Sequence, residues 1–181
     1  MNFITLKEVD IPIGKLNVQG SLVLPKANSG IIIFSHGSGS SRYSRRNQMV
    51  AKRLNENNFG TLLFDLLTEE EDQIYENRFD IDLLCKRLII VTEWVRNQTN
   101  TNHAQISYFG ASTGAASALM AAAKLKNISA VVSRGGRPDL VMKSLPSVIC
   151  PTLFIVGSLD QDVLALNKIA YDELNCVKNL E

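Results

Sequence analysis

The stretch Tyr108-Phe109-Gly110-Ala111-Ser112-Thr113-Gly114 decides the fold, because it joins an apolar run to an alanine-rich segment, residues 115–124. The run is typical of a buried strand and the segment of a helix. A serine on so sharp a strand-to-helix turn is held in a strained backbone conformation with its hydroxyl exposed, and the residues two before and two after it must be very small. Gly110 and Gly114 meet this requirement. The stretch therefore predicts a nucleophile elbow with Ser112 as the nucleophile.

Strand and helix patterns alternate on both sides of this turn. Short apolar runs predict strands of a parallel sheet, at residues 31–34, 61–64, 106–109, 128–132 and 153–156. Apolar residues spaced three and four apart predict helices, over residues 49–59, 83–95, 112–126 and 164–174. The alternating segment 11–24 predicts an N-terminal β-hairpin. The predicted fold class is α/β, a doubly wound and mostly parallel sheet flanked by helices, in a single domain over residues 1–181.

Composition narrows the function. Lysine and arginine total 19 against 18 acidic residues, a net charge of +1, which favours a small-molecule substrate over nucleic acid or a membrane surface. The three cysteines, Cys85, Cys150 and Cys176, lack metal-ligand spacing, and their odd number argues against a secreted disulfide framework. With no signal-peptide pattern or membrane-length apolar run, we expect a cytoplasmic protein without a metal or cofactor. The acidic stretch 69–72 is predicted to be a solvated loop.

Two backbone amides are predicted to form an oxyanion hole. One is the N–H of Thr113, at the start of the helix after the nucleophile. The second is the N–H of Ser38, in the loop Ser35-His36-Gly37-Ser38-Gly39-Ser40 that follows the strand over 31–34. This loop lacks the Gly-Lys-Ser/Thr ending of a P-loop and the third glycine of a dinucleotide fingerprint, which argues against a phosphate cradle.

Neither of the two histidines is placed to act as the catalytic base. His36 is predicted to stabilise the loop at the strand end by hydrogen bonding, with contact to substrate as the alternative. His103 precedes the strand that leads to Ser112, so it lies at the far end of that strand, roughly 17 Å from the nucleophile.

The catalytic acid is predicted to be Asp160. It follows the strand over 153–156, which places a carboxylate at the same edge of the sheet as Ser112, in the chain order serine then aspartate. Asp162 suits a contact with the N-terminal dipole of the next helix better. Asp65, after the strand over 61–64, suits a turn or loop anchor better.

Arginines at the same edge are candidates for binding substrate. Arg134 follows a strand and could bind a substrate carboxylate, and an ion pair with Asp139 or another loop acid is an equal alternative. Three further arginines are interpreted as a solvated helix face rather than a basic rim: Arg42, Arg45 and Arg46.

Together these residues resemble the dienelactone hydrolase-like branch of the α/β-hydrolase superfamily, over roughly residues 30–174. The segments that carry the resemblance are 35–40, 108–114, Val132-Ser133-Arg134-Gly135-Gly136-Arg137-Pro138-Asp139 and 151–160. The resemblance implies hydrolysis of esters or lactones by a serine or cysteine nucleophile, here Ser112, with Asp160 as the acid.

Such relatives continue into a last strand, a loop that bears the catalytic histidine, and a final helix. Residues 177–181 are interpreted as the approach to that strand, so we expect the last strand and helix to be missing. The isolated chain is then expected to be nearly inactive, with strand 153–156 as an uncovered edge through which a homodimer could form. The alternative to a hydrolase is a non-catalytic protein of the same fold that binds a ligand or partner.

Overall fold

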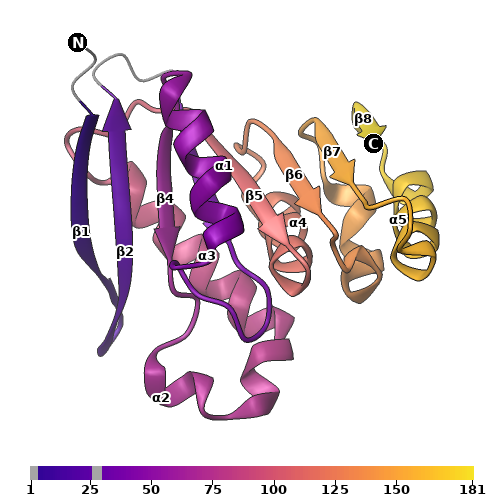
Figure 1. Ribbon diagram of the computed structural model, residues 1–181, viewed down its shortest axis with the longest axis horizontal. Helices are drawn as coiled ribbons and strands as arrows, with labels where there is room; N and C mark the ends of the chain where they lie inside the picture. Colours follow the sequence, from indigo (N-terminus) through magenta and orange to yellow (C-terminus); the bar gives the residue numbers. More distant parts are fainter. Residues whose placement is uncertain (1–3, 26–29) are drawn as a thin grey trace.

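A single eight-stranded sheet organises the computed structural model, which describes residues 4–25 and 30–181 (Figure 1). The strand order is β1-β2-β4-β3-β5-β6-β7-β8. β1 and β2 pair antiparallel, as do β2 and β4, and all other neighbours are parallel. The predicted fold class is confirmed. The strands are β1 (Ile4–Ile13), β2 (Leu16–Pro25), β3 (Ile31–Ser35), β4 (Gly60–Phe64), β5 (Ile106–Ala111), β6 (Val131–Arg134), β7 (Thr152–Ile155) and β8 (Lys178–Leu180).

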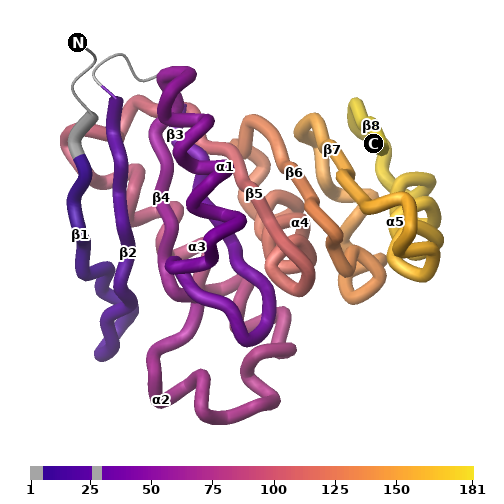
Figure 2. Tube along the Cα trace, viewed as in Figure 1, coloured from indigo at the N-terminus to yellow at the C-terminus, as the bar shows by residue number. Residues whose placement is uncertain are grey.

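Helices cover both faces of the sheet. α1 lies on one face, and α3 and α4 lie on the other (Figures 1 and 2). Beneath α1 lies a small apolar cluster, in which the rings of Phe34 and Phe109 pack at a tilt of 34° with their centroids 5.0 Å apart. The larger core lies between the sheet and the opposite helices. The helices are α1 (Arg45–Glu56), α2 (Glu69–Asp72), α3 (Ile81–Arg96), α4 (Thr113–Leu125) and α5 (Gln161–Glu173), with 3₁₀ helices η1 (Tyr75–Phe79) and η2 (Pro138–Ser147).

The acidic stretch 69–72 is a one-turn helix, α2, and not the solvated loop that the sequence predicted. The Thr68 side chain accepts a hydrogen bond from the Glu71 amide, and the Glu71 carboxylate accepts one from the Thr68 amide, which forms a capping box. Glu71 also pairs with Arg87 of α3, and Asp72 pairs with Arg78 at 2.8 Å. These partners lie outside the acidic stretch, so its charge run alone did not reveal them.

The expectation that β7 is the edge of the sheet is wrong. β8 pairs parallel with it, in the register Thr152 to Lys178 and Phe154 to Leu180. Beyond the strand, the Val156 amide donates to the Glu181 carbonyl oxygen at 2.9 Å. The backbone of β7 therefore has partners on both sides, and a homodimer through this edge of the sheet would have to use β8.

The turn between β5 and α4 has the strained geometry that the sequence predicted. Ser112 has φ 53° and ψ −124°, a conformation that residues other than glycine rarely adopt. A Cβ at Gly110 would lie 2.4 Å from the Cα of Ala115, and one at Gly114 would lie 2.1 Å from the carbonyl oxygen of Ser35. Only glycine fits at either position.

We therefore expect Gly114→Ala to lower the free energy of unfolding by about 3 kcal/mol or more, because the atoms that its methyl group meets are backbone atoms that cannot rotate away. Gly157→Ala is the matched control, since a Cβ at Gly157 meets nothing within 4 Å. Urea denaturation of both variants measures the difference. Equal stability of the two variants would contradict this account of the turn.

Candidate active site

Ser112 stands exposed at the carboxyl edge of the parallel strands. Its backbone amide donates to the carbonyl oxygen of Arg134 on the neighbouring strand, at 3.4 Å. The loop after β3 packs directly on the serine: a Cβ at Gly37 would lie 3.0 Å from the Ser112 Cβ and 3.7 Å from its Oγ. The serine hydroxyl thus lies between the start of α4 and this loop.

The two residues predicted for the oxyanion hole meet across this narrow space. The backbone N–H of Ser38 donates to the side-chain hydroxyl oxygen of Thr113 at 2.9 Å. Thr113 is the first residue of α4, where backbone amides have no partner within the helix. The structure therefore places Ser38 and Thr113 together, and the Ser38 amide already has an acceptor.

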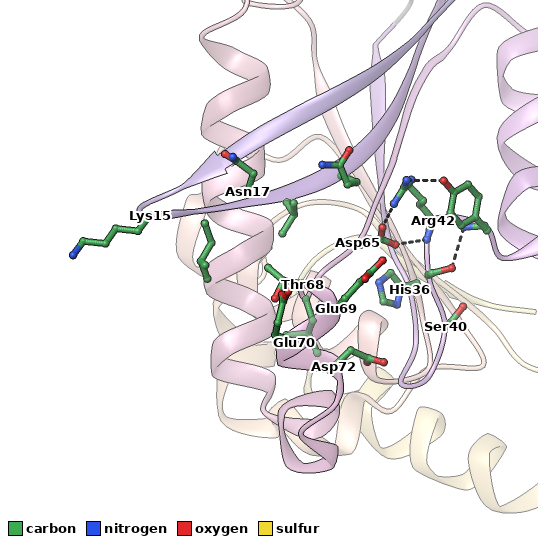
Figure 3. A pocket seen from close by; sticks show the side chains of 16 residues that line it. Lys15, Asn17, His36, Ser40, Arg42, Asp65, Thr68, Glu69, Glu70 and Asp72 are labelled. Carbon is green, nitrogen blue, oxygen red and sulfur yellow. Dashed lines mark hydrogen bonds and ion pairs between the residues drawn. The ribbon is translucent and has the colours of Figure 1, made fainter.

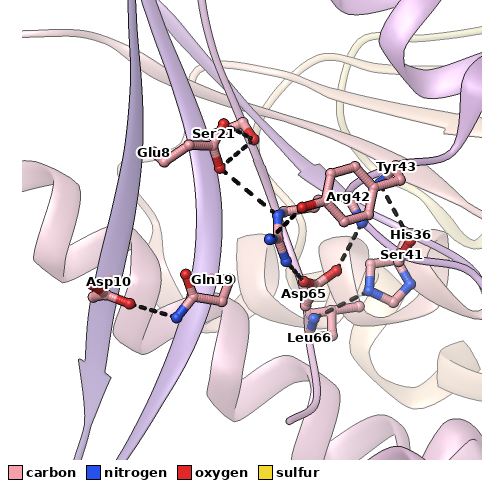
Figure 4. A network of polar contacts seen from close by, with 10 residues as sticks. All are labelled: Glu8, Asp10, Gln19, Ser21, His36, Ser41, Arg42, Tyr43, Asp65 and Leu66. Atoms are coloured by element: carbon pink, nitrogen blue, oxygen red, sulfur yellow. Dashed lines mark hydrogen bonds and ion pairs between the residues drawn. The ribbon is translucent and has the colours of Figure 1, made fainter. Parts of the chain in front are cut away.

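Both ring nitrogens of His36 form hydrogen bonds, and Figure 4 shows the one to Leu66. Nε2 accepts a hydrogen bond from the Leu66 amide at 3.1 Å, so Nδ1 carries the proton and donates to the Gly37 carbonyl oxygen at 2.9 Å. Burial lowers the pKa of His36 below its ordinary value, against the opposing effects of the Gly37 bond and of the Asp65 and Asp72 charges. His36 holds the loop to the end of β4, the first of the two roles considered for it.

The remaining histidine, His103, and the candidate acid, Asp160, lie at opposite ends of the parallel strands. His103 is exposed just before β5, at the end of that strand remote from Ser112. Asp160 follows β7, at the same edge as the serine, where its exposed side chain caps α5 by accepting from the Val163 amide at 3.4 Å. Asp162 lies in the first turn of that helix.

Asp65 anchors a loop, which is the role that its position in the sequence favoured. It accepts a hydrogen bond from the Arg42 amide at 2.8 Å and pairs with the Arg42 side chain (Figure 4). Arg42 also stacks on the Tyr43 ring, with the guanidinium carbon 4.3 Å from the ring centroid. It precedes α1 and is largely buried, so only Arg45 and Arg46 belong to the exposed helix face.

Arg134 does not pair with Asp139, which instead binds Arg137 through two hydrogen bonds of 2.8 Å. The guanidinium of Arg134 donates to the side-chain oxygen of Asn47 at 3.2 Å. Desolvation, and then the charge of Arg46, lower the pKa of Arg134. Asn47 is 3% exposed and belongs to α1. No sequence pattern indicates this contact, because it joins two residues 87 positions apart.

A polar hollow of about 690 Å³ lies beside the site, between the β1–β2 hairpin and the loops after β3 and β4 (Figure 3). Its charged lining is mixed, with carboxylates in the majority: Lys15, Arg42, Asp65, Glu69, Glu70 and Asp72. Neither Ser112 nor Asp160 lines it, so it is not the place where an acyl group would meet the nucleophile. Within the described residues no group of three histidine, cysteine or acidic side chains could hold a metal ion.

The arrangement of sheet, elbow and loop is that of an α/β-hydrolase, and comparisons with known proteins agree. The crystal structure of a dienelactone hydrolase from Anabaena variabilis is 47% identical, covers 98% of this chain and 84% of its own, and superposes with a TM-score of 0.94. The chain belongs to the dienelactone hydrolase family. Est1E from Butyrivibrio proteoclasticus shares the fold at 16% identity, with a TM-score of 0.80 over 96% of this chain and 88% of its own.

Two curated relatives from Mycobacterium tuberculosis strains carry a different name. Each is 54% identical over 165 residues and is provisionally named a phosphoribosyl transferase. The match covers 91% of this chain but 37% of the relatives, so the chain spans little more than a third of their length. No family model matches. None of the helices in the described part of the chain is long and apolar enough to span a membrane.

The burial of His36 predicts a pH dependence of stability. Because its pKa is lowered in the folded state, the unfolded state binds the proton more readily below about pH 6.5. The contribution of neutral, buried His36 to the free energy of unfolding is therefore complete above that pH. It is lost as the pH falls through the folded pKa, with a slope of up to about 1.4 kcal/mol per pH unit. Urea denaturation between pH 7.5 and 5 measures it. His36→Gln should remove this dependence of the free energy of unfolding on pH, whereas His103→Gln should keep it. If the free energy of unfolding falls with pH equally in wild type and His36→Gln, His36 is not its source.

Proposed function

We propose that this protein is a serine acyl hydrolase that cleaves carboxylic esters or lactones, with Ser112 as the nucleophile. The observation that supports it is the strained, exposed serine on the turn between β5 and α4, since that backbone strain costs about 1–3 kcal/mol and is characteristic of functional sites. The similarity to the dienelactone hydrolase of Anabaena variabilis supports the same class of reaction.

In the proposed reaction, Ser112 Oγ forms a bond to the acyl carbon and its proton passes to a general base. The carbonyl oxygen takes up the displaced electron pair and is stabilised by hydrogen bonds from Thr113, the first residue of α4. Collapse of this intermediate expels the alkoxide, which takes a proton from the base, and water then releases the acid by the same steps. Asp160 orients the base, a histidine outside residues 1–181, because His36 is occupied and His103 is remote.

A non-catalytic, ligand-binding protein of the same fold is the second candidate. What favours it is that neither histidine reaches Ser112 and that the Ser38 amide is already bonded. Phosphoribosyl transfer is not proposed, because the matched part of the mycobacterial relatives is this hydrolase-fold chain, about a third of their length.

An alkyl fluorophosphonate separates the two candidates, because it reacts with an activated serine and needs no turnover. Because the proposed base lies outside residues 1–181, labelling of this chain should be slow but selective: one covalent adduct per chain, on Ser112, detected by mass spectrometry of peptides. Ser112→Ala should lose the adduct, while Ser147→Ala, at an exposed serine in η2, should keep it. Failure to label Ser112, or equal labelling of several serines, would favour the ligand-binding candidate.

Arg134 is proposed to bind an anionic group of the substrate, such as a carboxylate. Arg134→Gln should then lower the rate at which an anionic aryl ester acylates Ser112 by about tenfold relative to a neutral aryl ester, the equivalent of about 1.4 kcal/mol. Release of the aryl alcohol under single-turnover conditions measures both rates. Arg53→Gln, at the exposed far end of α1, is the control. An unchanged ratio in Arg134→Gln would remove this role.

A further inference from the structure

The hydrogen bond between Ser38 and Thr113 limits which groups can stabilise an oxyanion. The Ser38 amide has a single hydrogen, and it points at Thr113 Oγ1, 2.9 Å away. That hydrogen is therefore already used within the protein. The backbone amide that the loop after β3 was predicted to contribute does not point at the substrate in this arrangement.

The Thr113 hydroxyl has the complementary property. In the Ser38 bond its oxygen is the acceptor, so its own proton remains to be donated. Among the hydrogen bonds of the described residues there is none in which Thr113 Oγ1 is the donor. Thr113 is only 2% exposed, and a buried hydroxyl proton without an acceptor costs about 1–3 kcal/mol. A group that receives this proton during the reaction would remove that cost.

The position of Thr113 identifies that group. Thr113 follows the nucleophile directly, and its hydroxyl lies against Ser38, next to Gly37, which packs on Ser112. A carbonyl carbon bonded to Ser112 Oγ has the start of α4 and this loop as its neighbours, and Thr113 is the first residue of α4. Donation from the Ser38 amide polarises the hydroxyl and so strengthens it as a donor.

We propose that the side-chain hydroxyl of Thr113 is a catalytic hydrogen-bond donor to the oxyanion, in place of the Ser38 amide, which acts through it. This inference rests on the proposed function and adds a group to the oxyanion hole. The hydroxyl keeps its proton throughout: it donates a hydrogen bond while negative charge is on the substrate oxygen and releases it when the carbonyl re-forms.

The test compares an activated aryl phosphate triester with its thiono analogue, in which sulfur replaces the P=O oxygen. In both reactions Ser112 Oγ bonds to phosphorus, the aryl oxide leaves with the electron pair of the broken bond, and the serine proton passes to the buffer. Oxygen accepts hydrogen bonds well and sulfur poorly, so the ratio of the two rates reports donors that touch this atom. A purely structural change slows both reagents equally.

Thr113→Val, which keeps the shape and removes the hydroxyl, is expected to slow the P=O reagent about 100-fold, and the thiono reagent much less. Thr113→Ser keeps the hydroxyl and should rescue the wild-type ratio of the two rates, and Ser147→Ala, at an exposed serine in η2, is the control for the rates themselves. Circular dichroism and thermal unfolding establish that each variant is folded, and Thr113→Ala replaces Thr113→Val in the test if the valine variant does not fold.

A rate ratio that is unchanged in the variant without the hydroxyl overturns the inference. So does a faster reaction, which would mean that Thr113 blocks the Ser38 amide. These failures differ from failure of the proposed function: if wild type shows no adduct on Ser112 with either reagent, both the hydrolase assignment and this inference fail. If wild type is labelled on Ser112 but the variant without the hydroxyl keeps the wild-type ratio of the two rates, only the role of Thr113 is removed.

Discussion

The close approach of α4 to the end of β3 is the constraint on which the rest of the site depends. Gly114 lies so near the Ser35 carbonyl oxygen that a methyl group would come within 2.1 Å of it. A buried hydrogen bond of 2.8 Å between the hydroxyls of Ser35 and Ser117 joins the same two elements. Because the loop after β3 begins at this contact, it is set directly against Ser112, and Ser38 reaches Thr113. Nucleophile and loop are thus positioned by one packing contact rather than by two independent loops.

This packing maintains the strained turn. A positive φ at Ser112 costs about 1–3 kcal/mol, and no side chain caps the start of α4 to offset it. The compensation lies in the helix itself, which packs against the sheet, α3 and η2 and whose residues Ala115, Ala116, Ala118 and Leu119 are fully buried. Small side chains let the helix lie close to the strands, and its burial against them stabilises the turn. The alanine-rich composition that predicted a helix therefore also explains how the turn is sustained.

Features carried by apolar runs and glycines could be predicted from the sequence, because backbone sterics and burial determine them locally. The central strands and the Ser112 turn belong to this group. β8 was missed because Lys178-Asn179-Leu180 is a short edge strand with little apolar pattern, and the strand expected over 128–132 begins only at Val131. Contacts such as Ser38 to Thr113 and Arg134 to Asn47 join residues 75 and 87 positions apart. They depend on where side chains point after folding, which sequence spacing does not encode.

Electrostatics give an independent reason to assign Arg134 a role in binding. Within the described residues neither Arg134 nor Arg46 has a carboxylate within 4 Å, and the two cations lie close enough for Arg46 to lower the pKa of Arg134. Arg46 also lies in the first turn of α1, which contains no acidic residue, where the helix dipole disfavours positive charge. Arg134 is partly desolvated as well, so three unfavourable effects act on the cations where Arg134 meets α1. A bound anion would be attracted by both guanidinium groups and by the N-terminus of α1 and would offset these costs, in keeping with the role proposed for Arg134.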